Sequence, residues 1–307
     1  MHQPLTKNFN RFAITIVVVM AFSAGCSSRN MMRLTANVVS PFIPETVHMS
    51  MAGTNTSYGQ GMYAMPGLIA LVGGFSEVSP KNYTLAWSAA QIFVATASYN
   101  EMARTDYASQ LAWQGYRFGI RSLMTFQRFR KAVESGTPIE RAVELLPDSA
   151  VEGLTWTSMS LALWMMMNIN DIMTMSYAPE VNNMIKRACE IDGAYFHAMP
   201  LMLDSVFSAM ASEMVQGCGL DRARESRAKM LEVNKGTLIL ADAYWAQIYA
   251  VGLRDRKLYK ELLNGVLNAP DDILEYKGWY LTTLAKGRAR WLLDNQELVF
   301  QNMGTVR

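Results

Sequence analysis

The segment YASQLAWQGYRFGIRSL, residues 107–123, decides the expected fold of this 307-residue chain. Small residues recur in it at intervals of three and four: Ala108, Ala112, Gly115, Gly119 and Ser122. On an α-helix this spacing puts all of them on one stripe. Because small side chains let another backbone come close, the stripe predicts a long helix packed tightly against a neighbour.

The segments on either side carry the same kind of pattern. Residues 81–99 place Ala86, Ala90 and Ala97 beside large aromatic residues, and residues 66–300 contain no convincing strand alternation. Prolines and polar clusters separate the periodic stretches, and Pro200 should kink one helix or delay its start. We therefore predict an all-α chain with ten or eleven helices, near 66–78, 81–99, 105–134, 138–146, 148–169, 178–191, 193–213, 220–233, 236–252, 255–268 and 272–294.

Long and short predicted helices alternate along the second half of the chain. Long helices begin near residues 148, 193 and 236, and shorter ones follow each of them. Such pairs cannot bury their apolar faces alone, so the pattern favours stacked antiparallel helix pairs in a tetratricopeptide-like solenoid or ring segment. A compact α-bundle is the alternative, because the repeat is irregular.

Composition and charge exclude several classes of protein. Half of the residues are hydrophobic and 18% are charged, which excludes a mostly disordered chain. Lys7 and Arg11 account for the formal net charge of +2, so the rest of the chain is neutral. A nucleic-acid partner is therefore not expected, and the Arg117, Arg121 and Arg128 face is interpreted as solvated or as a docking patch.

The N-terminus has the pattern of a secretory signal. A basic start is followed by the apolar run FAITIVVVMAF at 12–22 and then by small residues before Cys26. The Ala-Gly-Cys sequence resembles the lipobox of bacterial lipoproteins, although Ser23 stands where that motif usually has leucine. We predict a lipoprotein signal peptide at 1–25, lipid attachment at Cys26, a tether or leader at 26–65 and a helical domain at 66–300.

Two alternatives for the N-terminus remain open. The apolar run could stay uncleaved as a membrane anchor, or it could be an ordinary export signal that leaves Cys26 as a thiol. The leader contains NVVSPFIP, which would form a local strand or pack on the body. Cys189 and Cys218 would be a pair in an oxidising compartment or two buried small hydrophobic residues.

Seven stretches between about Met62 and Phe300 follow one another in a characteristic order. They are AMPGLIALVGGFSEVSPKNYTLAWSAAQIF at 64–93, the quoted segment at 107–123, GLTWTSMSLALWMMMNIN at 153–170, APEVNNMIKRACEID at 178–192, QGCGLDRARESRAKMLEVNKG at 216–236, YKELLNGVLNAPDD at 259–272 and LAKGRARWLLDNQELVF at 284–300. This order of motifs resembles the TRAP transporter T-component (TatT) family. The chain departs from the family pattern at GTNTSYGQG (53–61) and at Gly217-Cys218-Gly219-Leu220-Asp221.

This resemblance implies a function as well as a fold. It implies a periplasmic lipoprotein that forms a ring-like homotrimer and pairs with the solute-binding protein of a TRAP transport system. It also implies passage or holding of a small hydrophobic ligand. The outer membrane is expected from a separate feature: Ser27 follows Cys26, whereas aspartate at that position favours retention at the inner membrane. The alternative is a general tetratricopeptide-like envelope scaffold unrelated to transport.

Catalytic and metal-binding motifs are absent from the sequence. No HExxH, GxSxG, CxxC, P-loop or dinucleotide fingerprint occurs, and His197 is expected to be structural. We expect no enzyme activity, no cofactor and no metal; a carboxylate-based hydrolase is the enzymatic alternative. The 23 methionines, including Met165–Met167, are interpreted as core filling, with a soft-metal or oxidant sink and an adaptable cavity as alternatives.

Aromatic residues on the long helices are the candidates for lining a ligand cavity. Aromatic side chains combine a large apolar surface with defined shape, although most of them serve the core. The candidates are Trp113, Trp156, Trp164, Tyr244 and Trp245.

Overall fold

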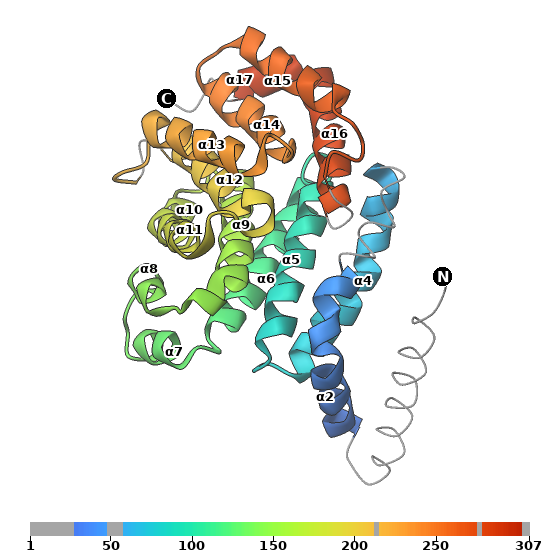
Figure 1. Ribbon diagram of the computed structural model, residues 1–307, viewed down its shortest axis with the longest axis vertical. Helices are drawn as coiled ribbons and strands as arrows, with labels where there is room; N and C mark the ends of the chain where they lie inside the picture. The colour runs from blue at the N-terminus through green and yellow to red at the C-terminus, as the bar shows by residue number, and fades with distance from the viewer. Residues whose placement is uncertain (1–27, 48–57, 212–214, 275–277, 303–307) are drawn as a thin grey trace.

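A computed structural model describes residues 28–47, 58–211, 215–274 and 278–302. Every regular element within these ranges is a helix, which confirms the all-α prediction. Consecutive helices joined by short connections pack against each other along the chain, as in the pairs α4–α5, α5–α6, α12–α13 and α15–α16 (Figure 1).

Helices α5 (Tyr83–Asn100), α6 (Thr105–Leu123) and α9 (Val151–Met167) form the centre of the molecule. A Cβ atom added to Gly119 would lie 2.9 Å from the Cα atom of Thr157 on α9, and one added to Gly115 would lie 3.3 Å from the carbonyl oxygen of Ala90 on α5. Real Cβ atoms need more room than this. The small-residue stripe of α6 therefore allows two neighbouring helices to touch its backbone, as predicted.

The expected helix over 105–134 is interrupted. Helix α6 ends at Leu123, and α7 (Gln127–Glu134) begins after Phe126, whose ψ of 117° is extended. The Phe126 ring packs edge-on against Tyr83, with centroids 5.1 Å apart, and the Thr125 hydroxyl donates to the Ser122 carbonyl oxygen. Tertiary packing and a local side-chain hydrogen bond thus override helical periodicity at this point.

The part of the leader that the structure describes is helical. Helices α2 (Ser28–Val39) and η1 (Ser40–Phe42) are followed by a helical turn at 43–47, and α2 packs on α4 (Tyr58–Val78). The NVVSPFIP stretch therefore packs on the body as helix and does not form a strand. Helix α4 also begins before the expected position 66 and contains Pro66 in its interior.

Helices α11 (Ala178–Asp192) and α12 (Tyr195–Met210) pack against α9, and α13 (Leu220–Asn234) packs on α12. The α12 backbone has positive φ at Phe196, His197 and Ala198, just before Pro200. Proline disfavours the α conformation in the residue before it and clashes with the preceding turn, so regular α-helix begins only beyond this kink. The predicted effect of Pro200 is confirmed. The short elements nearby are α8 (Ile139–Ala142), η2 (Val143–Leu145), η3 (Asp148–Ala150) and α10 (Ile172–Met175).

The C-terminal layer lies at the far end of the long axis from the start of α2 (Figure 1). The expected helix 236–252 is divided into α14 (Leu240–Trp245) and η4 (Ala246–Ala250), and η4 is a π-helix. The last expected helix, 272–294, begins as α16 only at Trp279 and ends at Asp294. The layer is completed by α15 (Arg256–Asn268) and α17 (Gln296–Asn302).

Candidate functional site

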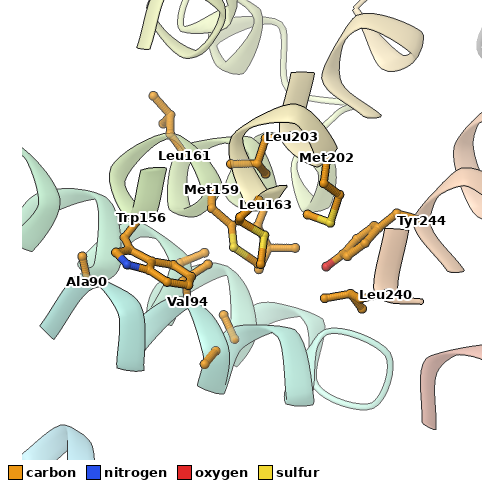
Figure 2. Close-up of a cluster of buried hydrophobic side chains, with 14 of the residues drawn as sticks. Ala90, Val94, Trp156, Met159, Leu161, Leu163, Met202, Leu203, Leu240 and Tyr244 are labelled. Atoms are coloured by element: carbon orange, nitrogen blue, oxygen red, sulfur yellow. The ribbon is translucent and has the colours of Figure 1, made fainter. Parts of the chain in front are cut away.

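An apolar cavity of about 40 Å³ lies between α9, α12 and the α14–η4 segment. Figure 2 shows Met202 and Tyr244 pointing toward each other, with Met159 and Leu163 beside them. A volume of this size holds little more than a water molecule or the tip of a larger molecule. Its lining consists of Met159, Ala162, Leu163, Met166, Met202, Leu203, Val206, Phe207, Met210, Tyr244 and Ile248.

A larger groove adjoins this cavity. Its volume is about 810 Å³, within the range of about 300–1,000 Å³ that is usual for small-molecule sites. Met166, Met210 and Ile248 line both hollows and so form the wall between them. Because methionine side chains are unbranched and flexible, this wall can change shape at low cost in free energy. The two hollows therefore adjoin through a wall that can adapt its shape.

Four residues from α14, η4, α16 and the end of α5 form a polar cluster at this wall. The Arg288 and Glu101 side chains form an ion pair and are 1% and 2% exposed. The Arg288 guanidinium lies 3.8 Å from the centroid of the Tyr244 ring and donates a hydrogen bond to Gln247 Oε1. Tyr244 faces the cavity, whereas Glu101 and Gln247 line the groove. The cluster thus gives an otherwise apolar site a fixed polar edge.

The π-helix positions two residues of this site. Gln247 and Ile248 both belong to η4, yet Ile248 lines the cavity and Gln247 reaches the Arg288 pair. The widened turn of a π-helix changes the direction of successive side chains, and such turns are frequent at functional sites. No pattern in the sequence around η4 predicts this π-helical turn.

The five aromatic candidates are distributed over four places. Tyr244 lines the cavity, and Trp156 is buried in the core, where its indole N–H donates to the Tyr195 hydroxyl at 3.3 Å. Figure 2 shows Trp156 over α5, beside Ala90 and Val94. The structure does not bring all five candidates to one site, and a ligand-lining role for them stays a prediction.

The remaining three candidates pack against other aromatic residues. Trp113 and Trp164 have centroids 4.8 Å apart and form one cluster with Tyr116 and Tyr177. Trp245 stacks on Tyr249 with ring centroids 4.2 Å apart, and the Arg227 guanidinium lies over the Trp245 indole ring. Neither group lines the two hollows that the described residues form.

Sequence reasoning missed the polar residues of the site. Glu101, Gln247 and Arg288 are far apart in the chain, and none belongs to a motif. The one available signal was the methionine run at 165–167, since Met166 lines both hollows and Met167 lines the groove.

The cysteines and histidines of the sequence analysis take no part in this site. Cys189 and Cys218 are free thiols, and burial raises the pKa of Cys189 to about 12. His197 lies in the α12 kink, where its carbonyl oxygen accepts a hydrogen bond from the Asn234 side chain at 3.2 Å. Cys26 and His48 lie outside the described residues.

Neither a metal centre nor a membrane-spanning helix occurs in the described ranges. No group of three or more His, Cys, Asp or Glu side chains there is arranged to hold a metal ion. None of the helices in the same ranges is long and apolar enough to cross a bilayer. The expected face of Arg117, Arg121 and Arg128 is divided, because Arg128 lies on α7 and the other two lie on α6, where Arg121 pairs with Glu77 at 3.0 Å.

Comparison with known proteins identifies the family. No curated protein matches the chain. The model of the family described as TRAP transporter T-component matches residues 62–300, which is most of the chain and begins within α4 and ends within α17. The chain therefore belongs to the TRAP transporter T-component family, whose members are accessory components of TRAP transport systems.

Proposed function

We propose that the protein is a periplasmic, lipid-anchored T-component that binds a TRAP solute-binding protein and holds a small ligand in the groove and cavity. The observation that carries the ligand proposal is the groove of about 810 Å³ with a methionine wall leading to an inner apolar cavity. Apolar pockets with a few convergent polar groups are the usual form of a small-molecule site.

The shape of the site indicates what kind of ligand it takes. The inner cavity has room only for the tip of an apolar chain, so most of the ligand lies in the groove. The half-buried Gln247 offers a polar side chain to a ligand there, while the buried Arg288 holds Gln247 by a hydrogen bond and pairs with the buried Glu101. The ligand is thus a small amphipathic molecule with a thin apolar end.

Anchoring and assembly complete the proposal. Acyl chains on Cys26 would hold the protein at the membrane, most suitably the outer membrane because Ser27 follows the cysteine. The protein would act as a homotrimer without catalytic activity. Sedimentation of the detergent-extracted protein should give the mass of three chains, and a monomer mass would contradict this part of the proposal.

Ligand binding can be tested with the apolar fluorophore N-phenyl-1-naphthylamine. Leu253 lines the groove and is 45% exposed, so Leu253→Glu places a charge in the groove at little cost in stability. Its affinity for the probe should fall by about tenfold or more. Leu145, 46% exposed on η2 and away from the groove, provides the matched control Leu145→Glu, which should bind normally. Equal binding by both variants would contradict the groove as the site.

Partner binding requires a separate experiment. The tagged protein, extracted with detergent from its own cells, should co-purify with a TRAP solute-binding protein identifiable by mass spectrometry. Recovery of envelope-assembly proteins without any such solute-binding protein would favour the scaffold alternative and overturn this part of the proposal.

A further inference from the structure

We infer that the first turns of α2 contact the membrane surface, so that the molecule stands on its N-terminal end with the groove turned away from the bilayer. The inference rests on the proposed acyl anchor at Cys26. It adds an interaction surface, whose partner is a bilayer with anionic headgroups.

The first step is the length of chain between the anchor and the helix. Helix α2 begins at Ser28, two residues after Cys26. Consecutive Cα atoms are about 3.8 Å apart, so the start of α2 lies within about 8 Å of the Cys26 Cα atom. An acylated cysteine sits in the headgroup region, and therefore α2 must begin there as well.

The second step is the surface that α2 presents. Met32 and Leu34 are 48% and 50% exposed, and Arg29 and Arg33 are exposed on the same helix. The first turn of α2 contains no acidic residue, and neither does the rest of its sequence, SRNMMRLTANVV. Apolar side chains together with arginines suit the boundary between acyl chains and anionic headgroups, because the arginines are attracted to the headgroups while the apolar side chains enter the acyl region.

The third step is the attachment of α2 to the body. The Asn37 side-chain oxygen accepts hydrogen bonds from the Ser79 hydroxyl and, at 3.1 Å, from the Asn82 amide group. Asn82 also caps the N-terminus of α5, and Ala36 of α2 is fully buried. These contacts join α2 to the central helices, so α2 and the body must share one orientation.

The orientation of the body follows from these steps. The start of α2 lies at one end of the long axis, and α14, α15 and α17 lie at the other (Figure 1). The groove is lined by Leu253, by Leu298 of α17 and by Gln247 of η4, which belong to that far end. With α2 at the membrane, the groove therefore opens toward the periplasm, where a soluble partner would meet it.

Lipid-borne quenchers provide the test, with the full-length acylated protein in vesicles of phosphatidylethanolamine and phosphatidylglycerol. An environment-sensitive fluorophore is attached to Leu34→Cys or to Leu298→Cys, which replace exposed leucines at the two ends of the molecule. The parent protein measures background labelling of Cys189 and Cys218. Headgroup-depth nitroxide lipids should quench the label at position 34 several-fold more strongly than the label at position 298.

Each other outcome has a defined meaning. Equal quenching at both positions, or none at position 34, overturns the inference. A blue-shifted but unquenched label at position 34 means that protein covers α2, which also overturns it. Mass spectrometry of the Cys26 peptide separates the two proposals: an unmodified Cys26 overturns the anchor as well, whereas an acylated Cys26 with an unquenched label overturns only the orientation.

A charge variant tests the chemistry of the contact. Arg33→Glu should lower the quenching at position 34 by about twofold, because an anionic side chain is repelled by anionic headgroups. Arg128 is exposed on α7, away from α2. Arg128→Glu changes the net charge by the same amount and should leave the quenching at position 34 unchanged. Equal effects of the two variants would mean that net charge, and not α2, controls the contact.

Discussion

The centre of the molecule and its C-terminal layer bury their helices in different ways. In the centre, α6 touches α5 and α9 through glycines, and the added Cβ of Gly119 would meet Thr157 backbone at 2.9 Å. Between α9, α12 and the C-terminal layer, long side chains enclose a cavity and a groove. Small residues thus give a rigid centre, whereas methionines and long polar side chains leave adaptable space.

The two regions also satisfy their buried polar groups differently. In the centre, buried hydroxyls donate to the backbone of their own helix, as Thr96 does to the Ile92 carbonyl and Ser160 to the Trp156 carbonyl. In the C-terminal layer, Arg288 reaches Glu101 and Gln247 on other elements. Local hydrogen bonds leave the central interfaces apolar, while the cross-helix cluster depends on correct tertiary packing.

The largest expected effect is the loss of the Arg288 side chain. Arg288→Met leaves the Glu101 carboxylate buried without its partner, and removing one member of a buried pair typically costs about 3–5 kcal/mol. Urea unfolding followed by circular dichroism measures this cost. The double variant Arg288→Met with Glu101→Leu should recover most of the lost free energy of unfolding.

An exposed pair provides the matched control. Arg256 and Glu297 are 47% and 70% exposed, so Arg256→Met should cost no more than about 1 kcal/mol. A similar cost for Arg256→Met and Arg288→Met would show that the buried cluster has no special role in the C-terminal layer.

Overpacking of the centre comes next. Gly119→Ala adds a Cβ where only glycine fits, and we expect a loss of about 1–3 kcal/mol in the free energy of unfolding. Gly74→Ala on α4 is the control, because nothing lies within 4 Å of its added Cβ; it should stabilise the protein by about 0.5–1 kcal/mol. Thermal unfolding that shifts alike in both variants would contradict tight central packing.

The same contrast explains what could be predicted from the sequence. The stripe from Ala108 to Ser122 encodes local geometry, so it predicted the close approach of α6 to its neighbours. The end of α6 at Leu123 could not be predicted, because it depends on Tyr83, a residue of another helix. Short-range sequence patterns predict which residues share one face of a helix. A helix end that is imposed by tertiary contacts leaves no periodic pattern in the sequence.

The site shows this limit more strongly. Glu101 and Arg288 pair although they lie 187 positions apart in the sequence, so no spacing rule could link them. Aromatic type alone also did not separate Tyr244, which lines the cavity, from Trp156, which fills the core. Whether an aromatic residue lines a cavity or fills the core depends on its neighbours in space, and these neighbours are known only from the fold.

The carboxyl group of Glu180, buried on α11 against Tyr116 of α6, should respond to pH. Burial raises its pKa above the ordinary value, while its hydrogen bond from the Tyr116 hydroxyl, at 2.7 Å, opposes this rise. Because the folded-state pKa is the higher one, the stabilising contribution is present at low pH and is lost as pH rises through the folded-state pKa. The wild-type protein should therefore lose stability relative to Glu180→Gln as pH rises from the ordinary glutamate pKa through the raised folded-state pKa.

Urea unfolding at several pH values measures this difference. Glutamine keeps an oxygen that accepts the Tyr116 hydrogen bond but cannot ionise, so the variant should lack this pH dependence and be the more stable form at pH 7. The exposed Glu144→Gln serves as control and should follow the wild-type profile. A Glu180→Gln variant that is less stable than wild type at neutral pH would contradict the raised pKa.

The smallest expected effect compares two swaps of nearly equal volume. Met202→Leu changes a fully buried residue of the cavity wall, where free space lets its neighbours adjust, and should cost well under about 1 kcal/mol. Leu85→Met makes the reverse change at a fully buried position on α5, and the dense surroundings should raise the cost toward about 1.5 kcal/mol. Urea unfolding of both variants gives the difference directly. If Met202→Leu is the more destabilising of the two, the methionine side of the cavity is packed as tightly as the centre, and adaptable space is not what separates the two regions.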